Sequence, residues 1–227
     1  MTDKQKCKNN IAVILEAAGN STRFGSNKLL HETEDGRPMI SSILGAVREA
    51  SQAFGQPADG PDPGTGRGIS MRRILVTQYD EIAALAPDFE VVMNTQPQLG
   101  ISRSMQLGIE AAGDADAYMF CVCDQPGLTA ASIANLIEAF CAEADAAASD
   151  PDEGRPAPIV SLSWQGKMYN PKIFSSFYRD ELMSLSGDTG GRQIIAAHKD
   201  ALLTVEAGSG SEVLDIDSKE EAGLSPQ

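Results

Sequence analysis

The chain has 227 residues, of which 42% are hydrophobic and 22% charged, values that are ordinary for a globular protein large enough to bury a full core. Its formal net charge of -14 argues against a nucleic-acid or anionic-membrane partner, because both need a basic face. The first ten residues are polar and no segment approaches the roughly 20 apolar residues of a membrane span, so we expect a cytoplasmic protein without a signal peptide.

Segments typical of strands and of helices alternate along the chain. The predicted strands are Ile11–Leu15, Arg73–Thr77, Glu90–Asn94, Ala117–Cys123, Pro158–Leu162 and Leu202–Glu206, with a short edge strand over Val213–Ile216. The predicted helices are Met39–Phe54, Arg103–Ala112, Thr129–Ala147, Pro171–Met183 and Gly190–His198, and Thr129 and Thr189 are expected to be N-caps. This alternation predicts an α/β fold, a Rossmann-like three-layer sandwich with a mostly parallel central sheet.

Two segments interrupt the alternating pattern. Residues 55–70 are dominated by Gly, Pro and Asp, and residues 143–158 are similar in their second half. The strand pattern resumes directly after each, so we interpret both as flexible insertions and not as domain linkers. The expectation is a single domain over residues 1–227 with a core from 11 to 221.

The loop after the first strand is the most informative segment. Small residues and two cations follow the strand in a fixed order: Ala17, Ala18, Gly19, Ser21, Arg23, Gly25 and Lys28. Free backbone N–H groups and two cations gathered at the end of a strand can hold a polyphosphate. The spacing fits neither a P-loop nor the G-x-G-x-x-G dinucleotide motif.

Two further segments are expected at the same edge of the sheet. Asp124 follows the strand that ends at Cys123, and a carboxylate that faces a phosphate loop is a suitable Mg²⁺ ligand. Parallel sheets bind ligands outside the carboxyl ends of their strands, so the loop from Glu16 to Lys28 should lie beside Asp124. Gly100 and Ser104 open a helix toward the same cleft. Cys121 and Cys123 are interpreted as buried small hydrophobes.

The carboxyl-terminal third contains an anion-binding turn and a pair of carboxylates. The turn over 185–192 is rich in Gly and leads into a helix, with Arg192 in its first turn, so it can receive an anion. Asp215 and Asp217 are expected on the same side of a short strand, where one or both would complete the metal site.

Together these segments resemble the molybdenum cofactor cytidylyltransferases of the MobA-like NTP transferase superfamily. The resemblance implies a nucleotide-diphospho-sugar transferase fold and transfer of CMP from CTP onto the terminal phosphate of molybdopterin, with release of pyrophosphate. It implies Mg²⁺ as cofactor, a nucleoside triphosphate and a pterin cofactor as substrates, and a molybdenum hydroxylase apo-enzyme as a partner.

The same resemblance distributes roles over the motifs. The loop after the first strand, with Gly100 and Ser104, would bind the nucleotide, and its Arg23 and Lys28 would be catalytic together with Asp124. The metal would be held by Asp124, Asp215 and Asp217. The acceptor would be bound by Gly187, Asp188, Gly190, Arg192 and Asn170.

Two residues depart from the pattern of that family. Glu16 stands where a small or apolar residue is usual, and it could accept a hydrogen bond from an exocyclic amino group, repel the triphosphate or hold a different metal. Asn170 stands where a histidine is usual, which affects acceptor recognition. The alternatives are therefore another phosphorylated acceptor, such as a sugar or alditol phosphate, use of GTP or ATP, or a non-catalytic protein that delivers the cofactor.

Overall fold

A seven-stranded sheet forms the centre of the molecule. The computed structural model describes residues 10–20, 27–33, 35–55, 69–149 and 155–216. The strands are β1 (Asn10–Ala17), β2 (Ser70–Thr77), β3 (Glu90–Met93), β4 (Ala117–Val122), β5 (Ile159–Trp164), β6 (Lys167–Ser175) and β7 (Leu202–Glu206). Their order is β3-β2-β1-β4-β6-β5-β7. β6 runs antiparallel to β4 and β5, and the other pairs are parallel, which confirms the mostly parallel sheet.

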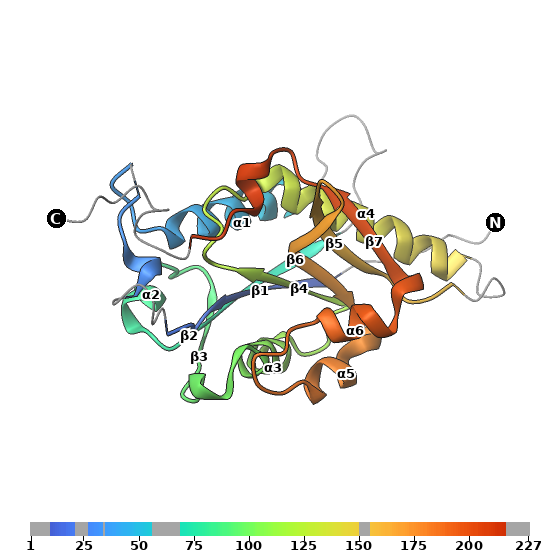
Figure 1. Ribbon diagram of the computed structural model, residues 1–227, viewed down its shortest axis with the longest axis horizontal. Coiled ribbons are helices and arrows are strands. Elements are labelled where there is room, and N and C mark those ends of the chain that lie inside the picture. The colour runs from blue at the N-terminus through green and yellow to red at the C-terminus, as the bar shows by residue number, and fades with distance from the viewer. Residues whose placement is uncertain (1–9, 21–26, 34, 56–68, 150–154, 217–227) are drawn as a thin grey trace.

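Helices cover both faces of this sheet (Figure 1). They are α1 (Ile40–Gly55), α2 (Asp80–Ala84), α3 (Ile101–Ala112), α4 (Ala130–Ser149), α5 (Arg179–Ser184) and α6 (Arg192–Ala197). Successive side chains of a strand point to opposite faces. Accordingly, Val13 and Leu15 of β1 belong to the core that includes α1 and α4, whereas Ala12 and Ile14 belong to the core that includes α3, α5 and α6. The three layers therefore match the predicted sandwich.

The order of the strands reverses at β1. The chain runs outward from β1 to β2 and β3, and then returns to place β4 on the other side of β1. Glu16 of β1 pairs in register with Val122 of β4, so the carboxyl ends of these two strands lie together. A crevice at such a reversal is the usual ligand site of an open α/β sheet.

The prediction of a helix over Pro171–Met183 was wrong. Its first part belongs to β6, in which the four residues from Pro171 to Phe174 are buried, and only α5 (Arg179–Ser184) is helical in its last part. Pairing with β4 and β5 on both sides outweighs the local helical pattern.

Two smaller predictions also need correction. The edge strand over Val213–Ile216 is absent from the described residues, where Gly210–Val213 forms a 3-10 helix. Thr189 is not an N-cap, since α6 begins at Arg192 after Gly191. Thr129 does cap its helix, because its Oγ1 accepts a hydrogen bond from the Ser132 N–H at 3.2 Å.

The expected insertions fall largely outside the described residues. Residues 56–68 and 150–154 are not described, but α4 continues to Ser149, so the first part of the 143–158 segment is helical. Cys121 and Cys123 are buried, as expected of small hydrophobes. No helix among the described residues is long and apolar enough to cross a membrane.

Candidate functional site

The two residues that follow β2 hold the first residues of the loop that follows β1. Gln78 Nε2 donates to the Ala18 carbonyl at 2.7 Å, and the Tyr79 hydroxyl donates to the Gly19 carbonyl at 3.1 Å. The start of the predicted phosphate loop is thereby fixed to the neighbouring strand. Ser21, Arg23 and Gly25, which the sequence assigned to phosphate binding, lie outside the described residues.

Lys28 and Asp124 form an ion pair across the strand reversal. Lys28 Nζ lies 2.7 Å from Asp124 Oδ2, and both side chains are largely buried. Lys28 begins a 3-10 helix, Lys28–Leu30, which is capped by the Asn27 side chain. The ion pair confirms that the loop after β1 lies beside the segment after β4.

Two carboxylate oxygens at this edge have no hydrogen-bond partner among the described residues. Asp124 Oδ1 and Glu16 Oε1 are both fully buried. A buried carboxylate oxygen without a donor is costly unless a ligand or a cation satisfies it. Asp124 Oδ1 therefore fits a divalent cation, for which carboxylate oxygen is a preferred ligand.

The predicted set of three metal-binding carboxylates is not assembled in the described part of the chain. Gln125 Nε2 donates to Asp215 Oδ1 at 2.7 Å, and the Ile216 N–H donates to the Asp124 carbonyl at 3.0 Å, so this segment lies beside Asp124. Asp217 is outside the described residues. Within the described ranges, no group of three His, Cys, Asp or Glu residues is placed to hold a metal ion.

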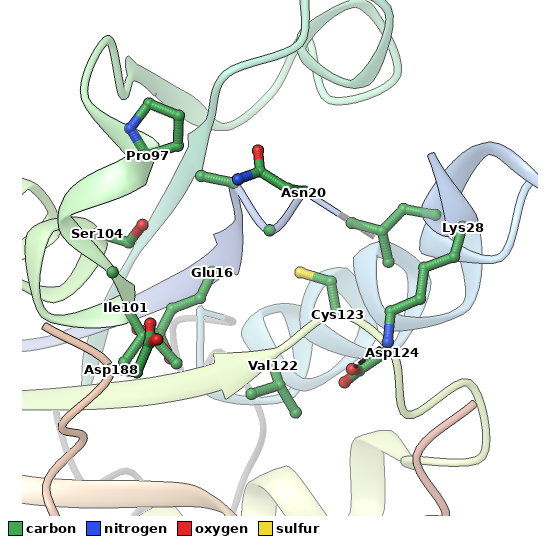
Figure 2. Close-up of a pocket in the computed structure, with 14 residues that line it drawn as sticks. Glu16, Asn20, Lys28, Pro97, Ile101, Ser104, Val122, Cys123, Asp124 and Asp188 are labelled. Carbon is green, nitrogen blue, oxygen red and sulfur yellow. Dashed lines mark hydrogen bonds and ion pairs between the residues drawn. The ribbon is translucent and has the colours of Figure 1, made fainter. Parts of the chain in front are cut away.

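Glu16, the residue before the last one of β1, lies at the centre of the site (Figure 2). Burial raises the pKa of its carboxyl to about 8; the positive charge of Lys172 opposes that increase, and the negative charge of Asp124 adds to it. A carboxyl in this environment holds its proton at neutral pH and then donates a hydrogen bond.

Gly100 joins the start of α3 to the turn at Gly187. Its φ is +86°, and a Cβ there would overlap the Gly187 carbonyl group. The Ser102 N–H donates to the Gly187 carbonyl at 3.2 Å. Ser104, one turn on, is buried, and its hydroxyl accepts from Asn94 Nδ2 at 3.1 Å. A glycine at position 100 thus lets the predicted nucleotide and acceptor segments touch.

These elements enclose a first cavity of about 260 Å³ (Figure 2). It is lined by residues from the ends of β1 and β4, the 3-10 helix and the start of α3: Glu16, Ala18, Gly19, Asn20, Lys28, Leu29, Pro97, Gly100, Ile101, Ser104, Val122, Cys123, Asp124 and Asp188. Of the described residues predicted to bind the nucleotide, Ala18, Gly19, Lys28, Gly100 and Ser104 line it. Ala17 is buried behind it and does not line it.

A second cavity of about 230 Å³ shares a wall with the first. Glu16, Ile101 and Asp188 line both. The remaining lining residues come from α3, β4, β6, the turn before α6 and the first residue of α6: Met105, Phe120, Asn170, Lys172, Phe174, Gly190, Gly191 and Arg192. The second cavity is therefore lined by four of the predicted acceptor residues, Asn170, Asp188, Gly190 and Arg192. The fifth, Gly187, does not line it but contacts Gly100 at the start of α3.

Sequence reasoning missed Lys172, a buried cation of this second cavity. Burial and, to a smaller extent, the charge of Arg192 lower the pKa of its ammonium to about 8, although the charges of Glu16 and Asp215 oppose this decrease. The mistaken helix over Pro171–Met183 hid this residue. A lysine between Pro171 and the apolar pair Ile173-Phe174 was the signal in the sequence that could have marked a functional position.

Comparison with known proteins places the chain among nucleotidyltransferase domains. The family model described as the MobA-like NTP transferase domain matches residues 12–202. No curated protein matches the chain significantly.

Solved structures share the fold at low sequence identity. Rv0371c from Mycobacterium tuberculosis H37Rv is 20% identical, with a TM-score of 0.66 over 94% of this chain and 95% of its own. It has also been solved in complex with manganese. A nucleotidyl transferase from Methanothermobacter thermautotrophicus (Mth528) is 21% identical, with a TM-score of 0.68 over 93% of each chain. The 4-diphosphocytidyl-2C-methyl-D-erythritol synthase of Anaerococcus prevotii is 14% identical, with a TM-score of 0.63 over 95% of this chain and 93% of its own.

Proposed function

This chain belongs to the MobA-like NTP transferase domain family, and on that premise we propose that it transfers CMP from CTP to the terminal phosphate of molybdopterin. An oxygen of the acceptor phosphate attacks the α-phosphorus of CTP, the bond between the α-phosphorus and the bridging oxygen breaks, and pyrophosphate leaves. In-line displacement of this kind depends on positioning and charge neutralisation, not on a covalent nucleophile.

One observation carries this proposal. Lys28 Nζ and Asp124 Oδ2 lie 2.7 Å apart at the strand reversal, and both residues line the first cavity. The other carboxylate oxygen of Asp124 is buried, has no hydrogen-bond partner among the described residues, and can act as a metal ligand. The lysine can neutralise the charge of a triphosphate, and the carboxylate can hold the divalent cation that accompanies it. A surface turn with only a structural role does not need a buried lysine next to a buried carboxylate.

The residues of the first cavity divide the work. Lys28 neutralises charge that develops on the departing pyrophosphate, together with Arg23 of the same loop. Gly100 and Ser104, at the start of α3, position the base and ribose. Asp124 would hold Mg²⁺ or a similar divalent cation, with Asp215 or Asp217 as a second ligand, and such an ion neutralises phosphate charge when it is bound.

The second cavity receives the acceptor. Asn170, Asp188, Gly190 and Arg192 line it, and its shared wall with the first cavity brings an acceptor phosphate close to the α-phosphate of the nucleotide. A molybdenum hydroxylase apo-enzyme would then take the product. The placement of two substrates in adjoining cavities provides the proximity that the reaction needs.

Glu16 and Asn170 favour a second candidate, in which the nucleotide or the acceptor differs. Both residues line the second cavity, and both depart from the motif pattern of the family that the sequence resembles. A sugar or alditol phosphate as acceptor, or GTP or ATP as donor, is the alternative that these two positions support.

A panel of nucleotides and acceptors tests the proposal. CTP, GTP and ATP are each mixed with Mg²⁺ or Mn²⁺ and with molybdopterin, a hexose 1-phosphate or an alditol phosphate, and pyrophosphate is measured. We expect the fastest release with CTP and molybdopterin. Tight nucleotide binding with no metal-dependent release for any pair would instead indicate a delivery protein.

A further inference from the structure

Lys172 is a buried cation for which the described residues provide one hydrogen bond. It lies on β6 opposite Phe120 of β4, and its side chain lines the second cavity at 7% exposure. Its Nζ donates to Asn170 Oδ1 at 2.8 Å. An ammonium has three donors, so two remain for a ligand in the cavity.

The charges around Lys172 indicate the sign of that ligand. Arg192 faces the same cavity and is close enough to lower the pKa of Lys172. Two cations beside one cavity repel each other, and burial adds to this cost. The ionised form of Glu16 attracts Lys172 across the cavity, but no ion pair joins the two within the described residues. An anion between Lys172 and Arg192 would relieve the repulsion.

The opposite wall limits how much negative charge the ligand can have. Glu16 and Asp188 line both cavities, and the Oε1 atom of Glu16 is buried with no hydrogen-bond partner in the described part of the chain. The protonated carboxyl of Glu16 can donate a hydrogen bond to a ligand, whereas the carboxylate of Asp188 favours hydroxyl or N–H groups of a ligand and disfavours a second phosphate. The cavity is therefore suited to a molecule with one phosphate and a hydrogen-bonding remainder.

We propose that Lys172, together with Arg192, forms the subsite that binds the phosphate monoester of the acceptor, and that this subsite selects acceptors with a single phosphate. The inference rests on the proposed function, because it assigns the second cavity to the acceptor. Lys172 binds the phosphate from the floor of the cavity, Asn170 holds the ammonium in place, and the exposed Arg192 contacts the phosphate from the start of α6.

Binding of inorganic phosphate tests the subsite directly. The full chain is titrated with inorganic phosphate by calorimetry, in the presence of a saturating non-hydrolysable CTP analogue that blocks the first cavity. We expect Lys172→Met to weaken phosphate binding at least tenfold, Lys172→Arg to restore part of it, and Lys167→Met to bind like the wild type. Lys167 is the matched control because it lies exposed on the same strand.

Each outcome separates the subsite from the proposed function. Unchanged phosphate affinity in Lys172→Met, with CTP affinity intact, would overturn the subsite and leave the nucleotidyltransferase proposal standing. If Lys172→Met loses phosphate affinity but the wild-type protein binds no nucleotide, the subsite would stand and the nucleotidyltransferase proposal would be overturned. Replacement of a buried lysine by methionine is expected to preserve the fold. In the transfer assay, Lys172→Met should raise the KM for the acceptor at least tenfold with the KM for CTP unchanged.

Discussion

The two cavities adjoin at Glu16, Ile101 and Asp188, but they are built from different kinds of structure. The first is formed by short segments that directly follow β1 and β4 and open α3. The second has its floor on β6, in the middle of the sheet, where Lys172 is buried among apolar neighbours. The lining of the first cavity comes largely from short contiguous segments, which a sequence motif can predict. The lining of the second cavity depends on pairing between strands that are far apart in the sequence.

Asp124→Asn is expected to have the largest effect, and it acts on the first cavity alone. It removes the carboxylate charge that pairs with Lys28 and that would hold the metal, so turnover should fall 100-fold or more, about 3 kcal/mol of transition-state stabilisation. Pyrophosphate release under saturating substrates measures this. Asp114→Asn, at an exposed position, is the control, and turnover near the wild-type value in Asp124→Asn would refute the role of Asp124.

Gly100→Ala attacks the junction between the two cavities. A Cβ at φ +86° would be strained and would overlap the Gly187 carbonyl, so the free energy of unfolding should drop by about 3 kcal/mol. Gly166→Ala is a matched control, because φ is +75° there but the space around it is open, and about 1 kcal/mol is expected. Equal losses in urea denaturation would show that the two loops do not depend on close contact.

Glu16→Gln tests the wall that the cavities share. The pKa of Glu16 rises from 4.5 to about 8 on folding, so ionisation favours the unfolded chain. The resulting destabilisation is absent below pH 4.5, grows between pH 4.5 and 8, and is constant above.

The glutamine variant should therefore be more stable than the wild type at pH 8, by about 2 kcal/mol after partial solvation is allowed for, and equally stable at pH 4. Thermal unfolding in the presence of a chelator measures the difference. Glu81→Gln, at an exposed position, is the matched control, and a Glu16→Gln variant that is less stable at pH 8 would contradict the prediction.

Lys28→Ala is expected to have the smallest effect and to act on nucleotide affinity. Loss of one cation that contacts the triphosphate should weaken CTP binding about tenfold, which corresponds to about 1.4 kcal/mol. Calorimetry with CTP checks this, with Lys199→Ala as an exposed control away from both cavities. An unchanged affinity would remove Lys28 from the nucleotide site.

The fold and the first cavity were largely predictable because their signals are local. The apolar run of β1 and the small residues after it predicted the position of the loop. The strand before Asp124 predicted that its carboxylate lies beside this loop, where it pairs with Lys28. Gly100 and Ser104 were found because a turn into a helix has a recognisable composition.

The second cavity was only half predictable. The turn at Gly187–Arg192 was visible, but β6 was mistaken for a helix, since its residues after Pro171 show apolar spacing that a helix also allows. Lys172 becomes a candidate site residue only because β6 pairs between β4 and β5, which buries its ammonium next to Glu16 and Arg192. Such pairing depends on residues far apart in sequence.

Transfer of a labelled α-phosphate tests the central claim most directly. The protein is mixed with CTP labelled at the α-phosphate, a divalent cation and molybdopterin, and the label and pyrophosphate are followed over one turnover. We predict that the label moves to the pterin product in step with pyrophosphate release, and that Asp124→Asn slows both 100-fold or more. A label that stays in CTP, or that appears in free CMP with none in the acceptor, would contradict the assignment.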